Sequence, residues 1–133
     1  MSRGQSLVEL AVCAPVVMLL ALGAVASVQV IDARAGLDAA TQAAAAEAAR
    51  APDPATAAMA ASTRFDSMVA GYPLRSPRVS ISMGTFSRTD EVVASATGSV
   101  DIAWASLIFP RRLTLEFRAT VPIESWRSHR PSR

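Results

Sequence analysis

GQSLVELAVCAPVVMLLALGAVASVQVI, residues 4–31 of this 133-residue chain, contains its longest apolar run. No charged residue occurs from Leu10 to Ile31, and as an α-helix these 22 residues would rise about 33 Å, enough to cross a bilayer core of about 30 Å. Pro15 lies inside the run, where a membrane helix tolerates proline because neighbouring groups can satisfy the freed backbone carbonyl. Residues 5–31 are therefore predicted to form a transmembrane helix.

Three kinds of N-terminal segment have an apolar run of this length. Ala24-Val25-Ala26 before Ser27 has the small residues of a signal-peptidase site, which would make the chain a small secreted protein. An unprocessed single-pass anchor, with a head that binds an envelope partner, is the second interpretation. The third is a pilin-type N-terminus. Glu9 favours this third interpretation, because a carboxylate beside a membrane helix is unfavourable and normally has a partner.

The residues from Arg3 to Glu9, with the apolar run behind them, resemble the processing site of type IV pilin-like proteins. The closer resemblance is to the TadE-like family of tight-adherence (Tad) pilus proteins. Its features are present here as Gly4, Glu9, the apolar run, Pro15 six residues beyond Glu9, and an Ala-rich helix that ends in residues 45–50, AAEAAR. The resemblance covers about fifty residues and implies a minor pilin or pseudopilin.

The resemblance also implies roles for particular residues. A prepilin peptidase would cut after Gly4, so that residues 1–4 are a leader peptide and Gln5 becomes the mature N-terminus. Glu9 would then offset the positive N-terminal amine of a neighbouring subunit during assembly. The implied partners are other pilin or pseudopilin subunits, the prepilin peptidase, an inner-membrane pilus assembly platform and membrane lipid. The implied function is assembly or priming of a Tad-type adhesive pilus.

Charge and helical spacing predict the orientation and the course of the chain beyond the membrane. Arg3 on the N-terminal side predicts a cytoplasmic N-terminus and an extracytoplasmic head in a single-pass protein of the cell membrane. Residues 32–50 continue the helix, with Arg34 and Asp38 as an i,i+4 pair opposite an apolar face made of Ala33, Leu37, Ala40, Ala44 and Ala48. A helix from about Gln5 to Arg50 would be about 70 Å long.

Residues 51–125 are predicted to form a small α+β head. Asp53 before Pro54 is a good start for a second helix, and Gly71 is a plausible stop. Apolar and polar residues then alternate in three runs that predict a pilin-like antiparallel sheet of about three strands: 79–83, 92–104 and 113–121. Residues 126–133 are predicted to be a basic flexible tail.

Composition argues against several other classes of protein. The net charge is +2, all thirteen basic residues are Arg, and they form no helical stripe, which argues against a nucleic-acid surface. The only cysteine, Cys13, lies in the apolar run, and the only histidine, His129, lies in the tail. No disulfide, metal site, cofactor or catalytic set is therefore expected, and the chain is predicted not to be an enzyme.

Overall fold

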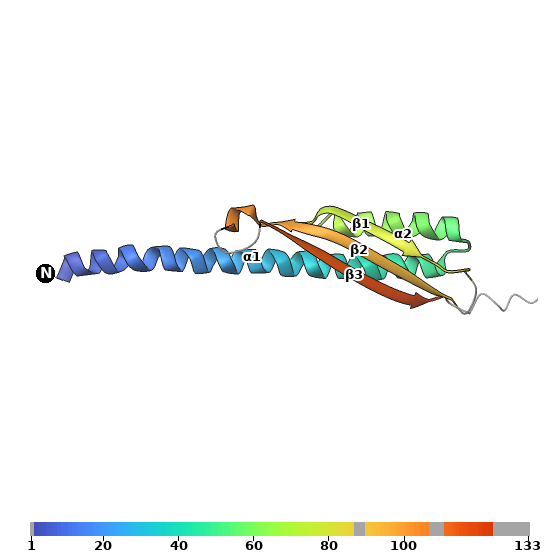
Figure 1. Cartoon of the computed structure of the whole chain (residues 1–133), viewed down its shortest axis with the longest axis horizontal. Coiled ribbons are helices and arrows are strands. Elements are labelled where there is room, and N and C mark those ends of the chain that lie inside the picture. Colours follow the sequence, from blue (N-terminus) through green and yellow to red (C-terminus); the bar gives the residue numbers. More distant parts are fainter. Residues whose placement is uncertain (1, 87–89, 107–110, 124–133) are drawn as a thin grey trace, which may run out of the picture.

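The computed structural model describes residues 2–86, 90–106 and 111–123. Its elements in chain order are α1 (Ser2–Arg50), α2 (Pro54–Val69), β1 (Arg75–Ser82), β2 (Glu91–Asp101), the 3-10 turn η1 (Ala103–Ala105) and β3 (Arg112–Pro122). Figure 1 shows α1 running the length of the molecule, with α2 and the sheet beside its C-terminal half. The predicted α+β fold, with a long N-terminal helix, a short second helix and a three-stranded antiparallel sheet, is confirmed. The predicted tail lies outside the described residues.

Helix α1 has 49 residues and is about 73 Å long. It begins at Ser2 rather than Gln5, so residues 2–4 of the expected leader are helical as well, and it continues through Pro15 without a break. The predicted apolar face on its second half is confirmed, because its five residues are fully buried: Ala33, Leu37, Ala40, Ala44 and Ala48. The alanines at four of these positions let α2 and the sheet approach the α1 backbone closely.

The predicted pair between Arg34 and Asp38 is not formed. Arg34 instead places its guanidinium 5.9 Å from the centre of the Phe117 ring in β3, a cation–π contact. Asp38 accepts a hydrogen bond of 3.0 Å from Nε2 of Gln42. Tertiary packing therefore replaces the local ion pair that the helical spacing suggested.

Helix α2 begins where the sequence predicts and ends slightly earlier. Asp53 is its N-cap and Pro54 occupies the first turn, whereas the last helical residue is Val69. Ala70 caps the C-terminus in a right-handed conformation, and the φ angle of Gly71 is not positive, so the helix ends without the left-handed glycine cap. The buried face of α2 consists of Ala57, Ala61, Phe65 and Val69.

Asp53 makes the start of α2 sensitive to pH. Its carboxylate accepts hydrogen bonds from the backbone N–H (2.9 Å) and the hydroxyl (2.7 Å) of Thr56, and these bonds hold the pKa of Asp53 below its ordinary value. Because the folded-state pKa is depressed, this contribution to stability is present above the unfolded-state pKa and is lost as pH falls through the folded-state pKa. We expect Asp53→Ala to lower the melting temperature of the head at neutral pH and to have a smaller effect in strong acid, as measured by circular dichroism. Asp66→Ala, on the same helix, is the control, and equal losses at both pH values would contradict this role.

The sheet has β2 in its centre, paired antiparallel with β1 and β3. Alternate residues of β2 are buried, and they face α1: Val92, Ala94, Ala96, Gly98 and Val100. The expected strand through Trp104 is too long, because β2 ends at Asp101. Oδ1 of Asp101 accepts a hydrogen bond of 3.1 Å from the backbone N–H of Ala103, which starts η1, and Trp104 lies in that turn.

The core of the head lies between α1, α2 and the inner face of the sheet. Its largest fully buried apolar side chains are those of Phe65, Leu37, Ile102, Val92 and Val100. Gly36 of α1 is covered by the ring of Tyr72, and a Cβ atom at this glycine would overlap that ring. The glycine thus lets the segment between α2 and β1 lie directly on the long helix.

Replacing Gly36 with Ala should destabilise the head. The new methyl group must displace the Tyr72 ring or the helix, and overpacking of this kind costs about 1–3 kcal/mol, partly offset by the better helix propensity of Ala. The measurement is urea unfolding of the detergent-solubilised chain. Gly23→Ala is the matched control, because it brings the same gain in propensity and, apart from the adjoining helix backbone, no described atom lies within 4 Å of its new methyl group. Equal unfolding midpoints for the two variants would contradict the contact.

Candidate functional site

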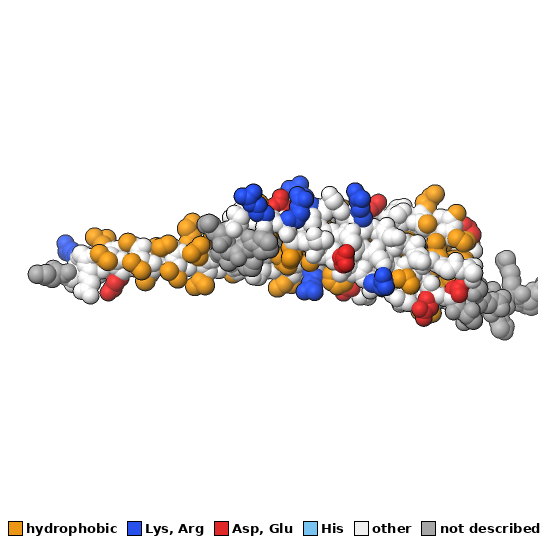
Figure 2. Space-filling model, viewed as in Figure 1, with side chains coloured by type: hydrophobic (Ala, Val, Ile, Leu, Met, Phe, Trp, Pro, Cys, Tyr) orange, Lys and Arg blue, Asp and Glu red, His pale blue; other side chains and the backbone are white. Residues whose placement is uncertain are grey.

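The N-terminal half of α1 is the part of the chain that the head leaves uncovered. Within the described residues, α1 is the one helix long and apolar enough to cross a membrane, and the mean hydropathy of its most apolar 18-residue window is 2.4. Only 6% of that window is buried, in contrast with the core helix of a soluble protein. Figure 2 shows apolar side chains along this extension, with charged side chains only near its N-terminal end.

The head begins to cover α1 before the apolar run ends. Ala26 is the first fully buried residue of the helix, with 1% of its surface exposed, and Val30 packs against the core of the head. The stretch from Ser2 to Val25 contains no fully buried residue and is about 36 Å long. One face of residues 26–31 thus belongs to the head, although the sequence pattern placed them in the membrane segment.

Gly4, Gln5 and Glu9 lie on the first turns of this uncovered helix. Apart from the adjoining helix backbone, no described atom lies within 4 Å of the position that a Cβ atom on Gly4 would occupy, so the backbone there is open to another molecule. Gln5 and Glu9 are four residues apart, which puts them on one face and about 6 Å apart along the axis.

Glu9 is exposed at the start of the apolar run, and no described residue gives its carboxylate a hydrogen bond or an ion pair. In water this arrangement is ordinary, but in or beside lipid an unpaired carboxylate is unfavourable by up to about 3 kcal/mol. In lipid, a partner for Glu9 would therefore come from outside the described residues.

Pro15 is six residues further along the helix. Because proline has no N–H, the carbonyl of Ala11 cannot receive the usual helical hydrogen bond from position 15. Further on, the hydroxyl of Ser27 donates to the carbonyl of Gly23 at 2.8 Å, which satisfies a polar side chain within the helix itself. A polar hydroxyl satisfied in this way is compatible with an apolar environment.

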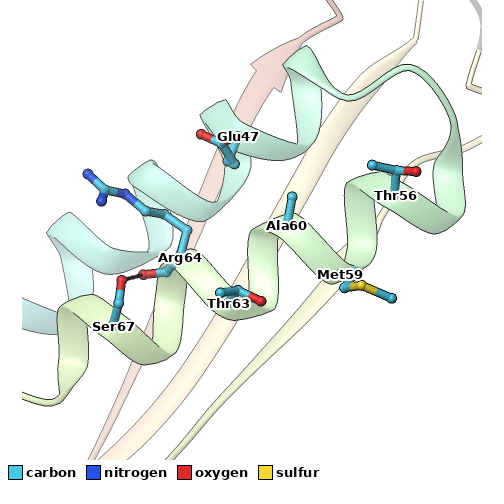
Figure 3. A pocket seen from close by; sticks show the side chains of 7 residues that line it. All are labelled: Glu47, Thr56, Met59, Ala60, Thr63, Arg64 and Ser67. Atoms are coloured by element: carbon cyan, nitrogen blue, oxygen red, sulfur yellow. Dashed lines mark hydrogen bonds between the residues drawn. The ribbon is translucent and has the colours of Figure 1, made fainter.

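A second feature is a groove between α1 and α2 at the far end of the head (Figure 3), with a volume of about 610 Å³. Its lining residues are Glu47, Thr56, Met59, Ala60, Thr63, Arg64 and Ser67. Met59 is 72% exposed, and the hydroxyl of Ser67 donates to the carbonyl of Arg64 at 2.8 Å. These residues include no histidine or cysteine, and within the described part of the chain no cluster of three or more His, Cys, Asp or Glu residues could hold a metal ion.

The architecture defines a class of protein. A single helix that is bare and apolar over its first half, and that packs against a small α+β head over its second half, fits a membrane-anchored protein.

Residues 4–50 match the model of the TadE-like protein family, which confirms the resemblance seen in the sequence. The match begins at Gly4 and ends at Arg50, the last residue of α1, so it covers this helix and none of the head that follows. The TadE-like family is structural and non-enzymatic. No curated protein and no solved structure matches the chain.

All four site residues predicted from the sequence, Gly4, Gln5, Glu9 and Pro15, lie on the uncovered part of α1. Gln5 and Glu9 lie on a common face of the helix, and Pro15 is exposed as they are. Sequence reasoning missed the display of Trp104 on a turn beside α1. The length of the segment between the second and third alternating runs indicates this turn, because that segment is longer than a tight hairpin needs.

Proposed function

We propose that this chain is a minor pilin or pseudopilin that takes part in assembly or priming of a Tad-type adhesive pilus after prepilin-peptidase cleavage behind Gly4. The observation that carries the proposal is the exposed Glu9 carboxylate, which has no partner within the described chain and stands at the start of a bare apolar helix. A signal peptide has no use for a carboxylate at this place, and a plain anchor has little use for one.

Cleavage behind Gly4 would create the missing partner. It frees an amine at Gln5, and this positive charge and the Glu9 carboxylate each need compensation in an apolar environment. Two parallel helices staggered by about 6 Å, four residues of rise, would bring Glu9 of one subunit level with the Gln5 amine of the next. An ion pair between neighbouring subunits forms only when they pack side by side, so it favours ordered assembly over isolated subunits.

The proposal also includes an orientation in the membrane and a set of partners. The N-terminus faces the cytoplasm, where a prepilin peptidase and an inner-membrane assembly platform would meet the exposed Gly4 and Gln5, and the head lies outside. Other pilin or pseudopilin subunits would pack along the uncovered apolar half of α1, replacing lipid.

The test of this function is the number of surface filaments in cells that lack the chain. We expect deletion to abolish or strongly reduce Tad-type filaments, and the wild-type chain to restore them. Gly4→Leu should reach the membrane but fail both to be processed and to restore filaments, because the side chain occupies the position next to the scissile bond. Ser2→Leu, which changes the leader away from that bond, should restore them. Normal filaments in the deletion strain would overturn the proposal.

A further inference from the structure

A hydrogen-bonded turn, η1, lies where α1 leaves the head. In Figure 1, η1 lies beside α1 at the end of the sheet nearest the N-terminal half of the helix. Ile102 and Ala105 are buried, with 1% and 2% of their surfaces exposed, whereas Trp104 between them is 45% exposed. Backbone hydrogen bonds from Ala105 to Ile102 (2.8 Å) and from Ile102 to the carbonyl of Arg111 (3.2 Å) hold the turn. The head is thus built to display an indole ring at this end.

Basic side chains gather at the same end of the head. The strand register places Arg75 opposite Ser99 and Arg112 opposite Asp101, and Arg111 comes directly before β3. All three arginines are exposed, and Figure 2 shows a group of basic side chains over this part of the molecule. Asp101 is the acidic residue among them. The opposite end of the head carries the carboxylates of Glu47, Asp53, Asp90 and Glu91.

We propose that this basic end of the head rests on the surface of the bilayer in which α1 is anchored, with Trp104 among the lipid headgroups and the three arginines on anionic phosphates. Indole rings favour the membrane interface because they are apolar with one polar N–H, and guanidinium groups bind phosphate through paired hydrogen bonds. Arginines near an anionic surface each add electrostatic attraction. The proposal rests on membrane anchorage of α1 and is independent of any role in a pilus.

The length of the uncovered helix fits such a docked head. From Gln5 to Val25 the helix is about 32 Å long, close to the hydrocarbon thickness of about 30 Å. If the head stood away from the surface, the exposed apolar side chains of Val25, Val28 and Ile31 would be drawn into water on the side of α1 that the head does not cover. A head on the surface keeps them at the edge of the bilayer.

The experiment measures the depth of Trp104 in lipid. The full-length chain carrying Trp126→Phe, so that Trp104 is its only tryptophan, is reconstituted in vesicles of phosphatidylglycerol and phosphatidylethanolamine. One set of vesicles carries bromine atoms on the acyl chains near the ester groups, and another carries them near the methyl ends. We expect blue-shifted emission and clear quenching by the shallow bromines, with weaker quenching by the deep ones.

Two further variants make the result decisive. Leu20→Trp in a Trp104→Phe, Trp126→Phe background reports on α1 and should be quenched by the deep bromines if the helix spans the bilayer. In the single-tryptophan background, Arg111→Gln with Arg112→Gln should reduce the shallow quenching of Trp104, whereas Arg64→Gln on α2 should not. Deep quenching at position 20 without quenching of Trp104 would overturn the docked head and leave the anchor intact. Loss of quenching at both positions would overturn the anchor and the docked head together.

Discussion

Glu9→Gln is expected to reduce surface filaments by at least about tenfold while leaving processing behind Gly4 intact. Removing one charge of a pair in an apolar setting leaves the other uncompensated and typically costs about 3–5 kcal/mol, more than the roughly 1.4 kcal/mol that corresponds to a factor of ten. Filaments counted by electron microscopy give the effect, and the mass of the membrane-bound chain gives the state of processing. The two readouts separate a failure of assembly from a failure of cleavage.

Glu47→Gln is the matched control for Glu9→Gln. It makes the same chemical change on the same helix, but at the far end of the head, where the side chain lines the groove between α1 and α2. Filament numbers with this control should stay close to those of the wild type. If Glu9→Gln supports as many filaments as Glu47→Gln, the charge-pairing role of Glu9 is wrong.

Phe65→Ala is expected to have the largest effect on stability. Among the described residues, Phe65 is the largest fully buried side chain, and it lies on the face of α2 that packs into the core of the head. Its truncation should cost about 3–5 kcal/mol, a large share of the roughly 5–15 kcal/mol by which domains are usually stable. Urea unfolding of the solubilised chain measures the loss of free energy of unfolding, and limited proteolysis of the head is the readout.

Met59→Ala provides the comparison on the same helix. Met59 is 72% exposed, so its truncation should change the free energy of unfolding by no more than about 0.5 kcal/mol. A Phe65→Ala variant as resistant to urea as Met59→Ala would show that the described core does not hold the head together.

Much of the fold follows from local sequence patterns. The apolar run and the Ala-rich segment behind it predict α1, Asp53-Pro54 predicts the start of α2, and period-two alternation predicts the three strands. These predictions succeed because each pattern reflects burial of one face or satisfaction of a helix end, which act over a few residues.

The errors arise where contacts between distant residues compete with local preference. Arg34 contacts the Phe117 ring rather than Asp38, because β3 lies alongside that part of α1. The alternation through Trp104 continues beyond the strand, because Asp101 caps the following turn. The ring of Tyr72 on Gly36 joins segments that are far apart in the sequence, and no local pattern encodes such a contact.

The residues of the candidate site are predicted from their spacing and not from a pattern of burial. Gly4, Gln5, Glu9 and Pro15 are recognisable by their spacing in the sequence, and all four are exposed in the described structure. Their proposed roles are directed at other molecules: a peptidase, a neighbouring subunit and lipid. Sequence spacing therefore identifies these residues more readily than intrachain packing does, whereas the display of Trp104 emerges only from the folded head.

The mature N-terminus of the chain tests the central claim most directly. The chain is purified from membranes of the native host, and its N-terminal peptide is identified by mass spectrometry. Processing by a prepilin peptidase predicts that the chain begins at Gln5. A chain that begins at Ser27 would be a secreted protein, one that begins at Met1 or Ser2 would be an unprocessed anchor, and either result would contradict the account.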